Sequence, residues 1–166
     1  KATGDLTLKR IPAADHTATP RPDNAIGNGL SAPRLVDINS DGTPDVIYAG
    51  DLKGNLWKFD VSAADPDDWK VAFSGQPLYK AVYTSGGSSS KQPITAPPTV
   101  KANDRGAGGM MVAFGTGRNL TEEDRTDTTS KHTIYSILDN TRYKLVSDKI
   151  TIDTAAATPT TVSGLT

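Results

Sequence analysis

Residues 34 to 61 decide the fold of this chain, and they read RLVDINSDGTPDVIYAGDLKGNLWKFDV. The stretch contains three runs rich in β-branched and aromatic residues, at 34–37, 46–51 and 56–61, with turn-forming residues between them. Such a pattern is typical of antiparallel strands. Similar runs recur at 69–73, 78–84, 110–115 and 133–139, whereas helical periodicity is almost absent. The sequence therefore predicts an all-β fold.

Oxygen-bearing side chains alternate in the loop between the first two runs. Counting from Asp37 they occupy positions 1, 3, 5 and 9, and Gly42 at position 6 permits a sharp turn. A hard cation such as Ca²⁺ takes six or more oxygen ligands in one small shell. We therefore predict a calcium site between two strands, with the Thr43 backbone carbonyl as a further ligand. The predicted ligands are Asp37, Asn39, Asp41, Thr43 and Asp45.

The loop departs from the EF-hand pattern. Position 12 is Tyr48 in place of a bidentate Glu, and strand-like runs flank the loop. Mg²⁺ fits less well than Ca²⁺, because it retains more of its water. The alternative is a hairpin in which Asp41-Gly42 only makes a turn. That alternative does not explain the remaining ligand-type residues, nor the absence of Lys and Arg between Leu35 and Leu52.

Composition and charge narrow the classes of function. The chain has 166 residues, 36% of them hydrophobic, with 15 Gly and 11 Pro, as expected of a loop-rich β protein. Its net charge of −1 gives no reason to expect nucleic acid or an anionic membrane as a partner. The sequence contains no Cys, which excludes disulfides and zinc–thiolate sites. It begins at Lys1 without a signal peptide or a membrane span, so we expect a fragment of a larger protein.

An imperfect internal repeat indicates the blades of a β-propeller. Ala96-Pro97 repeats Ala32-Pro33, and residues 110–115 and 133–139 repeat 46–50 and 55–60. Radial repetition of four-stranded sheets is typical of propellers. We therefore predict one fragment, residues 1–166, of an incomplete propeller with two to three blades. Its predicted parts are a leading strand (5–8) and loop within 1–29, a calcium-loop blade at 30–84, a linker loop at 85–92, a second blade at 93–148 and a loose tail at 149–166 with one strand at 150–152.

Several conspicuous residues are interpreted as structural. Trp57 and Trp69 are expected in the core, and Asp60 is expected to cap a turn. Gly115-Thr116-Gly117 follows a strand, but no phosphate-binding helix follows it, so we expect a strand-end turn.

The remaining polar residues show no catalytic pattern. His16 and His132 lack a neighbouring nucleophile, and surface or hydrogen-bonding roles are expected. The acidic clusters at 60–68 and 122–127 lack ligand spacing and are interpreted as solvated turns. Thr121-Glu122-Glu123-Asp124 is similar to a capping box and predicts one short helical turn.

Six segments follow one another in an order that is more specific than any one of them. They are GLSAP at 29–33, the 37–45 loop, YAGDLKGNLWKFD at 48–60, QPITAPP at 92–98, FGTGR at 114–118 and IYSILD at 134–139. Together they resemble the C-terminal β-propeller of PilY-type proteins, the large biogenesis and tip-adhesin factors of type IV pili. The resemblance covers residues 29 to 139, most of the chain.

The resemblance implies a modified propeller with quinoprotein-like four-stranded blades and a Ca²⁺ loop between two strands of one blade, here residues 37–45. It implies a non-enzymatic role in pilus extension, in opposing retraction and in surface attachment. The implied partners are other pilus components such as minor pilins, and host or abiotic surfaces. The implied location is extracytoplasmic, at the cell surface, pilus tip, outer membrane or periplasm, without direct membrane insertion.

Two alternatives remain open. One is a fragment of a quinoprotein (PQQ-type) dehydrogenase, which would need a complete ring around its cofactor and catalytic groups that the sequence does not show. The other is a calcium-stabilised adhesin propeller unrelated to pili.

Overall fold

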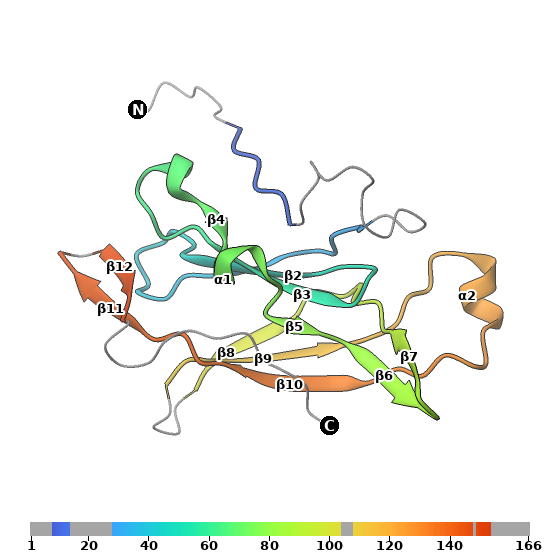
Figure 1. Ribbon diagram of the computed structural model, residues 1–166. Helices are drawn as coiled ribbons and strands as arrows, with labels where there is room; N and C mark the ends of the chain where they lie inside the picture. The colour runs from blue at the N-terminus through green and yellow to red at the C-terminus, as the bar shows by residue number, and fades with distance from the viewer. Residues whose placement is uncertain (1–7, 14–27, 104–107, 148, 154–166) are drawn as a thin grey trace.

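The computed structural model describes residues 8–13, 28–103, 108–147 and 149–153. These residues form two antiparallel sheets and two separate hairpins (Figure 1). The first sheet contains β1 (Arg34–Val36), β2 (Val46–Gly50), β3 (Asn55–Asp60), β4 (Lys70–Val71) and β5 (Tyr79–Lys80). The second contains β8 (Thr99–Ala102), β9 (Met110–Gly115) and β10 (Ile134–Asp139). The hairpins pair β6 (Val82–Ser85) with β7 (Ser88–Lys91), and β11 (Tyr143–Val146) with β12 (Lys149–Ile152).

The first sheet has the strand order β1-β2-β3-β4, and β5 also pairs with β3. Val36 lies opposite Val46 at the start of the β1–β2 ladder, so residues 37–45 form the loop of a hairpin. The strand–loop–strand prediction for this segment is therefore confirmed.

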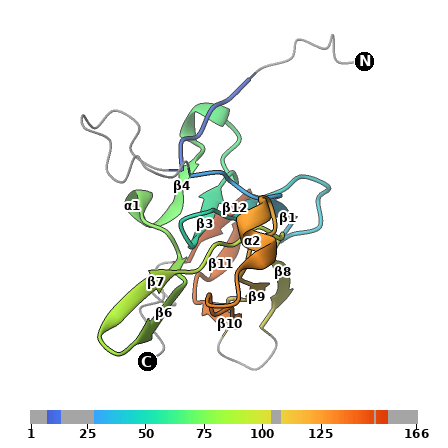
Figure 2. The ribbon, with the colours of Figure 1, turned by 90° about the vertical axis from the view of Figure 1, so that its right-hand side faces the viewer.

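The second sheet repeats this arrangement, with the order β10-β9-β8. It lies beneath the first sheet in both views (Figures 1 and 2), and β8 lies next to β1. Strands β8, β9 and β10 thus correspond to β1, β2 and β3. The prediction of an all-β chain built from repeated antiparallel sheets is confirmed.

Some local expectations were wrong. Residues 88–91, expected within the linker loop, form β7, because Gly86 and Gly87 (φ 58° and 81°) close a tight hairpin turn with β6. The run at 69–73 yields only the two-residue β4, since Phe73 and Ser74 adopt left-handed backbone (φ 54° and 55°) in the short α1 (Ala72–Gly75). Strands β8 and β11 had not been predicted.

The other local expectations have mixed outcomes. The predicted capping box is present, with Thr121 and Asp124 capping α2 (Glu122–Thr126) reciprocally. A three-residue 3₁₀ turn, η1 (Pro66–Asp68), precedes β4. The predicted strand at 150–152 is confirmed as part of β12. The predicted leading strand at 5–8 lies almost entirely outside the described residues. None of the helices in the described part of the chain has the length and apolarity needed to cross a membrane.

The core between the sheets is built from residues of both repeats. Tyr79 packs against Phe114 and Tyr135, with ring centroids 6.0 and 5.1 Å away. Buried aliphatic residues of both repeats complete this core, and they are Val46, Leu56, Leu78, Ile94, Val112 and Ile137. A second, smaller hydrophobic cluster surrounds Trp57. Its members come from the first sheet, from residues that directly precede or follow strands of that sheet, and from segment 11–13.

Gly50 lies at a close contact between the two repeats. A Cβ at this position would lie 2.5 Å from Cβ of Ile94 and 2.7 Å from its carbonyl oxygen. Gly115 ends the corresponding strand β9, yet a Cβ there would meet nothing within 4 Å. The two equivalent glycines therefore differ in their packing: of the two, only Gly50 lies where a larger side chain would not fit.

We predict that Gly50→Ala lowers the free energy of unfolding by about 1–3 kcal/mol, because backbone and Ile94 must shift to admit the methyl group. Gly115→Ala is the matched control and is expected to change it by less than about 1 kcal/mol. Urea denaturation followed by circular dichroism measures both. Equal losses in the two variants would contradict the assigned role of Gly50.

Candidate functional site

The loop between β1 and β2 turns through two left-handed residues. Ser40 has φ 63° and Gly42 has φ 92°. A Cβ at position 42 would meet nothing within 4 Å, so glycine is favoured there by backbone conformation and not by lack of space. These two residues let the loop double back within nine residues.

Asp37 organises the first half of the loop through its carboxylate. Its Oδ1 accepts hydrogen bonds from the backbone N–H groups of Ser40 (2.7 Å) and Asp41 (3.2 Å), and its Oδ2 accepts one from Gly42 (2.8 Å). The side chain at position 1 therefore faces the interior of the loop, as a ligand at this position requires.

Asp41 lies at the centre of the exposed part. Its Oδ1 accepts from the Thr43 N–H (2.8 Å) and the Thr43 hydroxyl (2.5 Å), and its Oδ2 accepts from Nδ2 of Asn39 (2.9 Å). The hydrogen bonds from Thr43 and Asn39 hold the pKa of Asp41 below its usual value. Asp41 thus stays ionised, on a surface that a cation from solvent can reach.

Asp45 closes the loop from a buried position, with 4% of its surface exposed. Its N–H donates to the Val36 carbonyl (2.9 Å), and its Oδ2 accepts from the Ile38 N–H (2.7 Å). Burial raises the pKa of Asp45, and repulsion from the Asp41 and Asp37 carboxylates raises it further. The three carboxylates are therefore close enough to repel one another.

The structure brings the five predicted residues into one hydrogen-bonded loop. Within the residues that the structure describes, however, no group of three or more His, Cys, Asp or Glu side chains is arranged to hold a metal ion. The carboxylates accept backbone N–H groups instead. The donor set of three carboxylates and one amide oxygen fits a hard cation, and binding one would require the side chains to rotate towards a common point.

A second polar centre joins the two sheets, and the sequence had not revealed it. Lys58 on β3 and Asp139 on β10 are 2% and 0% exposed, and Lys58 Nζ lies 2.5 Å from Asp139 Oδ2. The Tyr48 hydroxyl donates to the same oxygen (2.7 Å), and the Thr141 hydroxyl donates to the other (2.6 Å). Lys58 Nζ also donates to Thr141 Oγ1 (2.9 Å).

Aromatic rings enclose the Lys58 ammonium. Its Nζ lies 5.2, 5.5 and 5.8 Å from the ring centroids of Tyr143, Phe73 and Tyr48. Burial lowers the pKa of Lys58, and the Asp139 carboxylate opposes that shift. Burial would raise the pKa of Asp139, but Lys58 and the neighbouring hydroxyls outweigh it and hold this pKa below its usual value. The two side chains form a buried ion pair.

The signal for this pair was present but weak. Leu56 and Lys58 alternate with Trp57 and Phe59 along β3, and a lysine at such a position normally indicates a solvent-facing side chain. Only the position of Asp139 at the end of the corresponding strand β10 hints at a partner.

Another carboxylate, Asp51, stabilises the β2–β3 turn. It is fully buried, and it accepts hydrogen bonds from the backbone N–H groups of Lys53 (2.8 Å) and Asn55 (2.9 Å). It also accepts from the Asn55 side chain (2.9 Å) and the Trp57 indole N–H (2.8 Å). The indole of Trp57 is thus held as a core residue.

The two tryptophans, Asp60 and His132 occupy different environments in the structure. Trp57 is buried in the smaller cluster, as expected, whereas Trp69 is only partly buried and packs against it. Asp60 caps a turn by accepting from the Ser62 N–H and hydroxyl. His132 lines a surface cavity near α2. His16 lies outside the described residues.

Comparison with known proteins places the chain in a family. The family model of the PilY1 beta-propeller domain matches residues 21–158. The chain belongs to the PilY1 β-propeller family. Type IV pilus biogenesis factor PilY1 of Pseudomonas aeruginosa strain UCBPP-PA14 is 37% identical over 85% of the chain, and that of strain PAO1 is 40% identical over 82%. A PilY1 homolog of Xylella fastidiosa is 34% identical over 84%.

A solved structure agrees with this placement. The crystal structure of the P. aeruginosa PilY1 C-terminal domain aligns with 72% of this chain at a TM-score of 0.63 and 39% identity. The chain covers 27% of that structure and spans 12–14% of the length of the P. aeruginosa relatives. The predicted resemblance to PilY-type propellers is therefore confirmed. Because the P. aeruginosa and X. fastidiosa relatives are named as pilus biogenesis factors, the PilY1 family is favoured over the dehydrogenase alternative.

We predict that Lys58→Met destabilises this PilY1-family domain by about 3–5 kcal/mol, because it leaves the Asp139 carboxylate buried without a counter-charge. The double variant Lys58→Met/Asp139→Asn should recover part of the loss, since an amide carries no charge and can still accept hydrogen bonds.

The matched control is Lys144→Met, which removes the exposed Lys144–Asp153 pair (3.5 Å) and should cost less than about 1 kcal/mol. Chemical denaturation measures all three variants. A double variant less stable than Lys58→Met would show that the pair does not act through charge compensation.

Proposed function

We propose that the 37–45 loop binds Ca²⁺ and that this ion orders the β1–β2 hairpin of a non-enzymatic pilus biogenesis factor. The observation that supports the proposal is the loop geometry: Asp37, Asp41 and Asp45 lie on one nine-residue turn, and the Asp41 and Asp37 carboxylates lie close enough to Asp45 to add to the rise of its pKa that burial causes. A divalent cation stabilises a site of closely spaced carboxylates because its charge offsets the repulsion between them. Calcium is plentiful outside the cytoplasm, in keeping with an extracytoplasmic protein.

Each residue would contribute in a distinct way. Asp37 and Asp41 are exposed at the mouth and would meet the ion first, and Asn39 would add a neutral oxygen. Asp45 is buried and hydrogen-bonded to the loop backbone at Ile38, so it would supply a fixed oxygen at the base. The bound ion would supply positive charge, which offsets the repulsion among the three carboxylates.

Ordering the hairpin would stabilise an edge of the sheet. β1 pairs only with β2 in the described sheet, and the loop is the connection between them. Fixing the loop therefore restrains β1, which lies next to β8 of the second sheet. In this way an ion at one end of a hairpin can bias the surface that the domain presents to a partner.

For the whole protein we propose a role in pilus extension, in opposing retraction and in surface attachment. Its partners would be other type IV pilus components such as minor pilins, and host or abiotic surfaces. Its location would be the cell surface, pilus tip, outer membrane or periplasm. The support is membership of the PilY1 family, whose P. aeruginosa members are named type IV pilus biogenesis factors.

We predict that the wild-type chain binds Ca²⁺ in isothermal titration calorimetry and that Asp41→Ala weakens binding at least about tenfold, because it removes one charged ligand. Asp127→Ala is the matched control. Asp127 is also exposed and also caps a turn, accepting from Thr129 and Ser130, but it lies outside the loop. Unchanged affinity in Asp41→Ala would show that the ion, if bound, is held elsewhere.

We also predict that Ca²⁺ at a hundred times its Kd raises the free energy of unfolding by about 2.7 kcal/mol, because the ion binds the folded state alone. Thermal denaturation with Ca²⁺ and with excess chelator measures the difference. Mg²⁺ at the same concentration should stabilise less, since it is reluctant to give up its water. An identical melting curve in the two conditions would contradict the proposal.

A further inference from the structure

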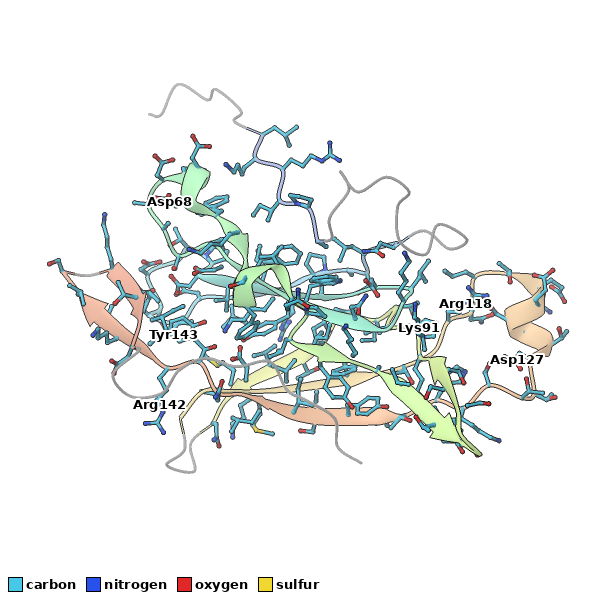
Figure 3. All side chains as sticks on the ribbon, in the orientation of Figure 1. Asp68, Lys91, Arg118, Asp127, Arg142 and Tyr143 are labelled. Atoms are coloured by element: carbon cyan, nitrogen blue, oxygen red, sulfur yellow. The ribbon has the colours of Figure 1, made fainter. Side chains whose placement is uncertain are left out.

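A cavity of about 470 Å³ opens beside α2, at the end of the molecule opposite the β11–β12 hairpin. Several hydrogen-bond donors from separate segments line it. They are Lys53, Ser89, Lys91, Arg118, Ser130 and His132. Figure 3 shows Lys91, Arg118 and Asp127 together at this end. The cavity shares no residue with the 37–45 loop.

Gly117 places Arg118 at the wall of the cavity. Its N–H donates to the Pro93 carbonyl (2.7 Å), and its carbonyl accepts from the Thr95 hydroxyl (2.7 Å). Its φ of +131° favours glycine, and a Cβ there would lie 3.5 Å from the His132 ring. His132 thus lies against Gly117, the residue before Arg118, and both Arg118 and His132 line the cavity.

Arg118 is held in one orientation by Asp124. Nε of Arg118 lies 2.6 Å from Asp124 Oδ1, and Asp124 Oδ2 accepts from the N–H groups of Leu120 (2.9 Å) and Thr121 (3.0 Å). The Asp124 side chain is 7% exposed, whereas that of Arg118 is 36% exposed. A guanidinium has five N–H donors, and the contact with Asp124 uses the one on Nε.

The second carboxylate of the cavity is also engaged within the chain. Asp127 accepts from the N–H groups of Thr129 (2.7 Å) and Ser130 (3.0 Å) and from the Thr129 hydroxyl (2.8 Å). A hydrogen bond with the Ser130 side chain, together with those from Thr129 and the Ser130 N–H, holds the pKa of Asp127 well below its usual value. Both oxygens of Asp124 and Oδ1 of Asp127 therefore accept from donors within the chain, while three basic side chains, Lys53, Lys91 and Arg118, line the same space.

We propose that this cavity binds an oxyanion, the carboxylate or phosphate group of a small ligand. A guanidinium fixed through Nε presents the planar donor geometry that matches carboxylate and phosphate oxygens. Lysine ammonium groups have three donors each, so Lys53 and Lys91 can contact a ligand in addition to their partners within the chain. The volume lies within the range of small-molecule sites. The proposal is independent of the Ca²⁺ loop.

The test is a titration of the ¹⁵N-labelled chain with citrate, with inorganic phosphate and with neutral sorbitol, followed by NMR. The buffer contains no Ca²⁺, because both anions chelate it. We expect shifts at residues 117–132 with an anion and none with sorbitol. Binding of citrate alone identifies a carboxylate ligand, binding of phosphate alone identifies a phosphate ligand, and binding of both supports the shared chemistry.

Two variants locate the site. Arg118→Gln and Lys91→Gln should each weaken anion binding by about tenfold, the loss expected for one charge-assisted hydrogen bond. Arg125→Gln is the matched control, because Arg125 lies on α2 and pairs with Glu122 (2.7 Å) but does not line the cavity. Absence of shifts with both anions, or an equal loss in Arg125→Gln, would overturn the proposal.

Discussion

The buried ion pair between Lys58 and Asp139 is the contact on which the arrangement of the two sheets depends. It joins the centre of the first sheet to the edge strand of the second across a sequence separation of 81 residues. Two charges taken out of water cost several kcal/mol each, so the pair is tolerated only because hydroxyls and aromatic rings surround it. The pair adds directional contacts to the apolar core that packs the two sheets together.

Strand β2 links this ion pair to the candidate calcium loop. Tyr48 on β2 lies opposite Lys58 on β3 and donates to Asp139, and the loop ends at Asp45, directly before β2. The loop is therefore connected to the sheet junction by one short strand. A change in the order of the loop would reach the contact between the sheets through β2 and not through the flexible surface.

The two repeats show how one architecture acquires different sites. In the first repeat, residues 51–54 turn tightly between β2 and β3, and Asp51 satisfies their backbone. In the second repeat, residues 116–133 replace that turn between β9 and β10. This insertion carries Arg118, Asp124, Asp127, Ser130 and His132, which line the cavity beside α2. The strands are alike in the two repeats, and the connections between β2 and β3 and between β9 and β10 differ.

The sequence by itself determined what is local: the strands around Gly50, the alternating oxygen-bearing side chains from Asp37 to Asp45, the Thr121–Asp124 cap and the internal repeat. The strands, the spacing and the cap depend on residues a few positions apart, where periodicity and turn chemistry act directly, and the repeat is visible because such local patterns recur. Only the tertiary structure decided that Lys58 is buried against Asp139, that Gly50 and not Gly115 is required by packing, and that Arg118 and Lys91 share a cavity. Those features depend on contacts between distant segments. The sequence around a lysine on a strand does not reveal whether its ammonium group contacts a buried carboxylate or water.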